Sequence, residues 1–172
     1  RKTAVHVKMD TGMGRLGIPW DRMAPCLERF LKHRGLLVEA LMSHLSSADE
    51  PDRTFTAEQI KRFGQAVQQA RSMGLELPLN SLANSAGVMA HRAAFFQMVR
   101  PGIMLYGGSP SPQFESTVPL RAVMHLRGRV LQIRELPDST PVGYGRTYYT
   151  QGNRRVAVVS AGYAEGLPRR MS

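Results

Sequence analysis

The sequence predicts an α/β fold in which repeated βα units are followed by a smaller all-β part. Apolar strands and amphipathic helices alternate over residues 4–106, and this alternation favours parallel βα units. Four such units make half of an eight-stranded barrel, and they could also form a smaller open sheet. After the Pro/Ser-rich segment 107–113, apolar and polar residues alternate as in half-buried antiparallel strands. We therefore place a domain boundary near residue 113, between a βα part (1–113) and a β part (114–172).

The elements of the βα part follow from hydrophobic period and from stop signals. We expect strands at 4–8, 36–42, 77–80 and 102–106, and helices at 21–33, 56–74 and 88–98. The second helix has the clearest start signal. Thr56 is its expected N-cap, Gln59 completes a capping box, and Phe55 is placed to staple onto Ile60. Gly74 is its expected end.

In the β part, the apolar phase changes between two neighbouring segments. Met124 and Leu126 are at even positions, whereas Leu131 and Ile133 are at odd positions. Gly128 lies between them, so we predict a β-bulge there. A further buried strand is expected at 156–159.

Composition limits the class of protein. The apolar share of 42% and charged share of 21% are those of a globular protein. The sequence has no run of about 18 apolar residues, so we expect no membrane span. The formal charge of +10 comes mainly from scattered arginines without a basic stripe, which argues against nucleic-acid binding. The single cysteine, Cys26, allows no internal disulfide, fits a reducing cytoplasmic location and is expected to pack as a small apolar residue.

A glycine-rich loop follows the first strand. It carries Lys8 and Arg15, seven residues apart, and its glycines at 12, 14 and 17 allow the backbone to approach a ligand closely. This pattern suits a loop that holds a small anionic molecule better than one that only reverses the chain.

Other polar groups stand near the carboxyl ends of the expected strands, where βα barrels carry their functional groups. They are His44, Asn84 with Ser85, and Gly102 with Ile103, and Arg100 stands just before the last expected strand. Each has an ordinary structural explanation: His44 as a satisfied histidine, Ser85 as a helix cap, Arg100 as a surface arginine. Their common location favours function, because a hydroxyl and backbone amides are the donors that a phosphate needs.

Six motifs in order carry a family resemblance. They are residues 8–17 (KMDTGMGRLG), 43–50 (SHLSSADE), 83–86 (ANSA), 100–107 (RPGIMLYG), 143–148 (GYGRTY) and 162–166 (GYAEG). In this set the chain resembles the alanine racemases over essentially its whole length. The resemblance implies the C-terminal half of a TIM-type (β/α)8 barrel followed by part of an all-β domain. It also implies a pyridoxal 5′-phosphate enzyme that interconverts L- and D-alanine in the bacterial cytoplasm and supplies D-alanine for peptidoglycan.

By the same resemblance, Tyr144 is the expected catalytic base, with His44 beside it and Arg100 facing the pyridine nitrogen of the cofactor. Asn84, Ser85, Gly102 and Ile103 join Arg100 as expected cofactor-binding residues. Arg15, Lys8 and Tyr163 are expected at the substrate, and Asp49 and Arg169 in the channel through which substrate reaches the site. Glu165 stands where the family usually has aspartate, and Leu45 where phenylalanine is common.

The chemistry explains these residue types. The Cα–H of alanine is a very weak acid, so its removal needs the electron sink of the pyridoxal ring. Inversion needs one base on each face of the Cα. Arg100 stays protonated and can donate to the ring nitrogen without protonating it. In the family the lysine matching Lys8 is often carbamylated, and the resulting anion would hold Arg15 where an unmodified lysine would repel it.

The family's Schiff-base lysine, in a lysine-alanine-tyrosine-glycine context, matches none of the four lysines. A C-terminal part of the family's β domain is also not matched. We therefore expect an internal fragment that is inactive alone, from a parent that is a homodimer with an active site shared between subunits. Two alternatives stay open: a serine or broad-specificity racemase of the same fold, and a non-enzymatic pyridoxal-phosphate carrier. No metal site is expected.

Overall fold

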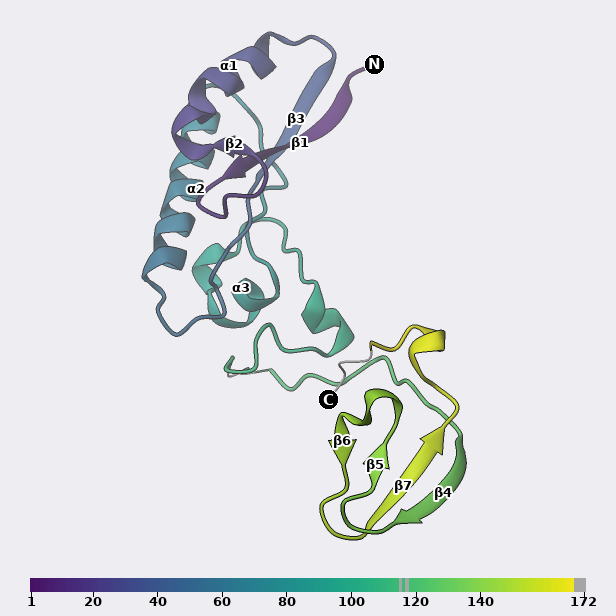
Figure 1. Ribbon diagram of the computed structural model, residues 1–172. Helices are drawn as coiled ribbons and strands as arrows, with labels where there is room; N and C mark the ends of the chain where they lie inside the picture. Colours follow the sequence, from purple (N-terminus) through teal and green to yellow (C-terminus); the bar gives the residue numbers. More distant parts are fainter. Residues whose placement is uncertain (115, 117, 169–172) are drawn as a thin grey trace. The chain divides into compact units, whose positions relative to one another are not determined.

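The computed structural model describes residues 1–114, 116 and 118–168 (Figure 1). The chain divides into two compact units, Arg1–Met124 and His125–Ser172, and each is described by itself. The division lies after Met124, compared with the boundary near residue 113 that we placed from sequence. The first unit contains the longer helices and the parallel strands, and the second contains antiparallel strands.

Parallel strands form the centre of the first unit. Strands β1 (Thr3–Asp10) and β3 (Leu36–Met42) pair in parallel, and the short β2 (Ile18–Pro19) pairs in parallel with the other side of β1. Two single parallel bridges, Met42 with Ser81 and Ser81 with Met98, extend the order beyond β3. Successive βα units therefore add neighbouring parallel segments in chain order, as in part of a βα barrel. The expected strands at 4–8 and 36–42 are confirmed.

The other two expected strands are wrong. Residues 77–80 are irregular, with a turn at 78–79, and the parallel position is occupied by Ser81 alone. Residues 103–106 form the 3-10 helix η3 (Ile103–Tyr106), and the parallel position lies earlier, at Met98. Both errors have one physical cause, because a short apolar run has no period that separates a strand from a turn or a helical turn.

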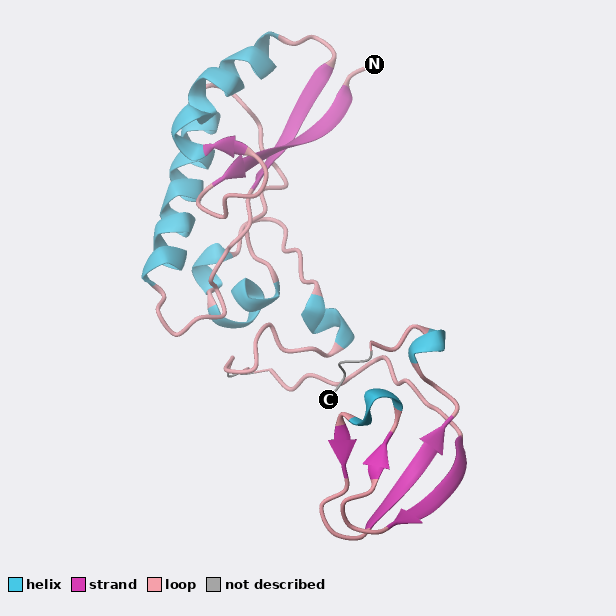
Figure 2. Ribbon diagram, viewed as in Figure 1, coloured by secondary structure: helices cyan, strands magenta, loops and turns pink. Residues whose placement is uncertain are grey.

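Helices α1 (Met23–Lys32) and α2 (Thr54–Ser72) lie along one side of the parallel strands (Figure 2). A 3-10 turn, η1 (Trp20–Arg22), precedes α1. The core between helices and strands includes fully buried apolar side chains, among them Met9, Met23, Leu27, Leu41, Phe63 and Leu82. The Phe63 and Phe96 rings meet edge to face with centroids 4.8 Å apart. Cys26 lies in α1 and is partly exposed.

The expected capping box of α2 is wrong. The helix begins at Thr54 with Arg53 as N-cap, and the cap makes no side-chain hydrogen bond. Thr56 and Gln59 are therefore inside the helix, where both are fully buried. Phe55 is likewise a helical residue and no longer stands at the position from which a staple forms. A threonine followed three residues later by glutamine fits either a capping box or two buried polar side chains within a helix. Only tertiary packing distinguishes the two.

The expected helix at 88–98 begins earlier and is shorter. It consists of α3 (Ser85–Ala90) and the 3-10 turn η2 (Arg92–Ala94). Among the described residues, none of the helices combines the length and the hydropathy that crossing a lipid bilayer requires.

The second unit is built from two antiparallel pairs. Strand β4 (Val130–Leu136) pairs with β7 (Arg154–Val159), and β5 (Pro141–Val142) pairs with β6 (Tyr148–Tyr149). The register of β4 shifts between Val130 and Gln132, so the irregularity lies two residues beyond the bulge expected at Gly128.

Burial in the second unit differs from expectation. The strand expected at 156–159 is part of β7, yet Val158 and Val159 are exposed, as are Leu131 and Ile133 of β4. Met124 and Leu126 are exposed and lie outside any strand. An alternating pattern identifies the apolar side of a strand, but burial also needs a second layer, and no described residue buries these side chains.

Candidate functional site

A cavity of about 290 Å³ lies in the first unit beyond the carboxyl end of β3. Its lining includes the six first-unit residues that we predicted to act in catalysis or cofactor binding: His44, Asn84, Ser85, Arg100, Gly102 and Ile103. Asp49, Ala86 and Pro110 complete it. These residues come from three segments that leave neighbouring parallel positions at the same edge, so the topology brings together residues nearly 60 positions apart.

The base of this cavity contains a hydroxyl and backbone amides. Ser85 Oγ accepts hydrogen bonds from the backbone N–H of Gly102 (2.8 Å) and of Met104 (3.3 Å). Asn84, not Ser85, caps α3, because its Oδ1 accepts from the N–H of Gly87 (3.0 Å). Asn84 Nδ2 also donates to the carbonyl of Leu45 (3.1 Å). Since Asn84 is the cap, the buried Ser85 hydroxyl is directed to the segment at Gly102.

Arg100 is held by two acceptors that the sequence did not single out. Its guanidinium donates to Ser81 Oγ and to the carbonyl of Ser43. The backbone N–H of Arg100 also donates to the carbonyl of Ala83 (2.9 Å). Burial lowers the pKa of Arg100, but an arginine retains its charge over the range in which proteins fold. The guanidinium is therefore a fixed cation in the cavity wall.

Positive charge gathers around His44. Lys8 pairs in register with Met42, so it lies at the same end of the sheet as His44. Burial, and next the charges of Arg100 and Arg15, lower the pKa of Lys8. Burial, and next the charges of Lys8, Arg100 and Arg15, lower the pKa of His44. Such a group of cations is unfavourable by itself and suits an anionic ligand.

The loop that carries Arg15 is fixed by Asp10, a residue that our sequence analysis missed. Its carboxylate accepts from the N–H groups of Gly12 (2.8 Å), Met13 (2.8 Å) and Gly14 (2.9 Å), and these bonds, led by that of Gly12, lower the pKa of Asp10. Gly17 has φ of +124°, and a Cβ there would lie 2.7 Å from the carbonyl carbon of Met9. An aspartate followed by glycines is the signal that identifies such a turn.

Tyr144 and Tyr163 belong to the second unit. Tyr144 lies in the loop between β5 and β6, flanked by Gly143 and Gly145, and its side chain is 82% exposed. Tyr163 begins the 3-10 helix η5 (Tyr163–Glu165) and is also exposed. Glu165, the residue that departs from the family pattern, accepts from the N–H of Gly162 (2.7 Å). Arg169, expected in the access channel, lies outside the described residues.

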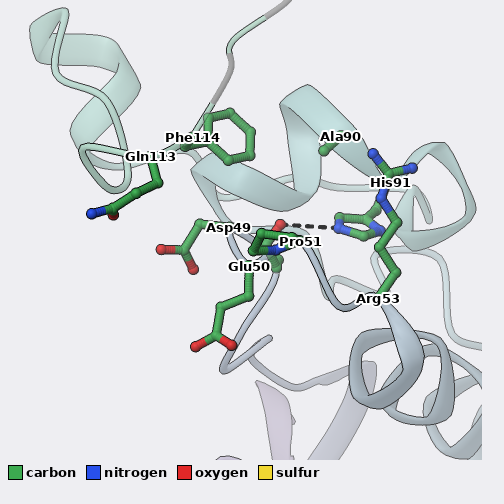
Figure 3. Close-up of a pocket in the computed structure, with 9 residues that line it drawn as sticks. Asp49, Glu50, Pro51, Arg53, Ala90, His91, Gln113 and Phe114 are labelled. Atoms are coloured by element: carbon green, nitrogen blue, oxygen red, sulfur yellow. Dashed lines mark hydrogen bonds between the residues drawn. The ribbon is translucent and has the colours of Figure 1, made fainter.

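Asp49 also borders a second cavity of about 340 Å³ that we did not predict (Figure 3). Glu50, Arg53, His91 and Phe114 contribute to its wall. The His91 Nε2 atom lies 3.0 Å from the carbonyl oxygen of Ala48, which ties the segment after α3 to the chain beside Asp49. The two cavities share Asp49, so this residue stands where they adjoin.

Parallel βα units with a positively charged cavity at the strand ends are the arrangement of part of a βα barrel, here followed by an antiparallel β unit. The model for the alanine racemase N-terminal domain matches residues 1–110, and that for the C-terminal domain matches residues 123–172. The chain therefore belongs to the alanine racemase family, and its fold is part of a TIM barrel followed by part of a β domain.

Individual relatives agree with the family. An alanine racemase of Syntrophobacter fumaroxidans is 40% identical over 168 residues, which cover 98% of this chain and 44% of that protein. The structure of alanine racemase from Streptomyces coelicolor A3(2) matches with a TM-score of 0.82 and 35% identity, over 98% of this chain and 45% of that one. That from Bartonella henselae, with covalently bound pyridoxal phosphate, matches with a TM-score of 0.77, 29% identity and shares of 98% and 45%. The chain thus spans somewhat less than half the length of the curated relatives it matches.

Proposed function

We propose that this chain supplies the phosphate cradle, the Arg15 loop and the tyrosine base of a pyridoxal-phosphate-dependent alanine racemase. One observation carries the proposal: the six residues that the family resemblance assigns to cofactor and catalysis in the first unit line a single cavity. The relatives are named alanine racemases, which supports alanine as the substrate. The Bartonella henselae structure contains covalently bound pyridoxal phosphate, which supports that cofactor.

The donor set of the cavity fits pyridoxal 5′-phosphate. Ser85 Oγ accepts from the N–H groups of Gly102 and Met104, which leaves its own proton available. This hydroxyl and the amide of Ile103 are short neutral donors of the kind that hold phosphate oxygens. Around the position of a Cβ on Gly102, Ser85 Oγ is the nearest atom, at 4.0 Å, so the absence of a side chain leaves room for a phosphate beside Gly102. The charges of Arg100, Lys8 and Arg15 match the negative charge of the phosphate.

When bound, pyridoxal phosphate withdraws electrons from the amino acid and makes its Cα–H acidic enough to transfer. Arg100 provides a fixed hydrogen-bond donor on the ring side. Arg15 binds the carboxylate of alanine, and Asp10 fixes the loop that presents Arg15. His44 stays neutral near pH 7, because burial and the surrounding cations lower its pKa, so its imidazole can accept a hydrogen bond at the cavity.

Tyr144 removes the proton from the Cα of L-alanine and returns it there in the reverse direction. Its exposure between two glycines supports a role at a surface that a second subunit completes, which agrees with the homodimer that we expect. The opposite face of the Cα needs a second base, and the family's cofactor-bearing lysine matches no lysine of this chain. We therefore expect no turnover by the chain alone.

The single cysteine of the chain agrees with a cytoplasmic location.

Carbamylation of Lys8 would complete the electrostatics. Burial, Arg100 and Arg15 lower the pKa of Lys8 and raise the fraction of neutral amine. The neutral amine attacks carbon dioxide, an N–C bond forms, and one proton leaves, so a carbamate anion replaces the ammonium. That anion accepts hydrogen bonds from Arg15, whereas the ammonium repels it.

Cofactor binding can be tested on the chain itself. Equilibrium dialysis should detect binding of pyridoxal 5′-phosphate and much weaker binding of pyridoxal, which lacks the phosphate. Ser85→Ala should weaken binding of the phosphate form about tenfold, whereas Ser72→Ala, at the exposed end of α2, should leave it unchanged. Equal affinity for the two compounds would contradict the cradle.

Racemisation can be tested in a chimera. This chain replaces the matching 168-residue segment of the Syntrophobacter fumaroxidans relative, which restores the lysine and the remaining length. The chimera should interconvert L- and D-alanine, and Tyr144→Phe should reduce the rate from L-alanine at least about 100-fold, whereas Tyr149→Phe serves as the matched control. A preference for serine would favour the alternative racemase, and cofactor binding without turnover would favour the carrier.

A further inference from the structure

We propose that Gln59, with its buried side chain, is a positioning residue for the cavity. It holds the segment that carries His44, and it connects through the hydroxyls of Thr11 and Ser43 to the residue whose carbonyl accepts from Arg100. This rests on the proposed function, since it names a support of the same site. Gln59 belongs to helix α2 and is not one of the residues that line this cavity.

Gln59 is unusual among the glutamines of its helix. Its side chain is fully buried, whereas the other three glutamines of α2 are exposed: Gln65, Gln68 and Gln69. A primary amide buried without hydrogen bonds costs free energy, so its position indicates that all of its donors and acceptors are used.

The amide of Gln59 makes four hydrogen bonds. Its Nε2 donates to Thr11 Oγ1 (3.1 Å) and to the carbonyl of His44 (3.1 Å). Its Oε1 accepts from the backbone N–H of Ser46 (3.0 Å) and from Ser46 Oγ (3.1 Å). Both N–H donors and both lone pairs of the side chain are therefore occupied.

Two of these bonds satisfy backbone groups that would otherwise pair with a neighbouring strand. Strand β3 ends at Met42, so the carbonyl of His44 and the N–H of Ser46 have left the ladder. Gln59 pairs with both, on either side of Leu45, as the peptide of an adjacent strand would do. The backbone direction at His44, and with it the aim of the imidazole, is thus set by a side chain from α2.

A second connection leads toward Arg100. Thr11 and Ser43 are almost completely buried, and their hydroxyl oxygens lie 2.8 Å apart. The carbonyl of Ser43 accepts from the Arg100 guanidinium. Gln59 is consequently linked to both the histidine and the arginine of the cavity, one through a backbone carbonyl and the other through two hydroxyls.

A purely structural role for Gln59 predicts different behaviour from a positioning role. Methionine has nearly the same length and volume as glutamine and fills irregular core space well, so it preserves packing while removing all four hydrogen bonds. If Gln59 only fills space, Gln59→Met leaves the cavity unchanged. If it positions His44, the imidazole moves relative to the charges that face it: Lys8 on β1, Arg15 on the following loop, and Arg100 and Asp49 in the cavity wall.

The test is a histidine titration by NMR on the full 172-residue chain. The His44 resonance is identified among five histidines with a His44→Gln spectrum. In Gln59→Met, the pKa of His44 should return toward its ordinary value by about 0.5 unit or more, whereas Gln68→Met should leave it unchanged. Dialysis with pyridoxal 5′-phosphate should show about fivefold weaker binding for Gln59→Met only.

Thr11→Val provides a second variant should Gln59→Met not fold. It removes only the hydroxyl between Gln59 and Ser43, so it should weaken cofactor binding while the pKa of His44 stays constant. An unchanged His44 pKa in folded Gln59→Met, or unchanged cofactor affinity in Thr11→Val, would overturn the proposal. If the wild-type chain binds no cofactor, the proposed function fails, yet a shift of His44 in Gln59→Met still supports the positioning role.

Discussion

Replacing Asn80 with leucine tests how the parallel strands are completed. Asn80 is fully buried, its Oδ1 accepts from the backbone N–H of Leu41 (2.9 Å), and its Nδ2 donates to the carbonyl of Leu77 (3.0 Å). This side chain thus pairs with β3 at the level where we had expected a strand at 77–80. Leucine has a similar volume and can make neither bond.

The cost of Asn80→Leu follows from the two groups left without partners. A buried unpaired N–H or C=O costs about 1–3 kcal/mol, and both Leu41 and Leu77 are buried. The added apolar surface offsets about 1–2 kcal/mol. We therefore expect the free energy of unfolding to fall by about 3 kcal/mol, a large part of the roughly 5–15 kcal/mol of a typical domain.

Urea unfolding followed by tryptophan fluorescence measures this change. Trp20 is the single tryptophan and lies in the first unit, so the signal reports on that unit. With an m-value of about 2 kcal/mol/M, the midpoint should fall by about 1.5 M. Gln97→Ala is the control, because it removes only the 3.2 Å bond from Asn80 to an exposed side chain. An Asn80→Leu midpoint equal to that of Gln97→Ala would refute the reasoning.

Two further predictions concern titration and the Arg15 loop. The pKa of His44 is lowered by burial and then by Lys8 and neighbouring arginines, so the unfolded chain takes up the proton first as the pH falls. The contribution of His44 to stability is therefore complete above the ordinary histidine pKa of about 6.5 and declines below it; melting temperatures should fall less steeply with acid in His44→Gln. For the loop, Asp10→Asn should speed amide hydrogen exchange at Gly14 about tenfold, because the carboxylate accepts from that N–H, and exchange equal to wild type would argue against the loop's dependence on the carboxylate.

The sequence predicted the cavity better than it predicted the strands that form it. The segment 102–106 was expected to be a strand, which would have placed Gly102 at the amino end of that strand. In the structure the parallel position is Met98, so Gly102 and Ile103 come after it and reach the cavity. The motif placed Gly102 and Ile103 with the other predicted residues, and they do line one cavity. The strand position depends on pairing between Ser81 and Met98, which no local pattern records.

Residues with buried supporting roles were the ones that sequence analysis misread. Thr56 and Gln59 have the spacing of a capping box, and the same spacing also places two side chains on one face of a helix. Ser43 and Ser81 have no distinctive pattern, yet they hold Arg100. Asp10 was missed as well, although an aspartate before a glycine-rich turn is a recognisable signal. Hydrogen bonds between distant segments are therefore what the sequence leaves undetermined.

The charges of the site explain why its residues favour an anion. After burial, the charges of Arg100 and Arg15 lower the pKa of Lys8, and those of Lys8, Arg100 and Arg15 lower the pKa of His44, which marks repulsion between like charges. The ion pair found within the described part of the chain joins Arg62 to Glu58 and neutralises none of them, while the Asp10 carboxylate is already bonded to three backbone N–H groups. A phosphate, a substrate carboxylate or a carbamate on Lys8 would each supply the missing negative charge. Repulsion among these cations destabilises the free site, and a bound anion would relieve it. Because a ligand that binds only the folded state stabilises that state, an anion should raise the free energy of unfolding of the chain.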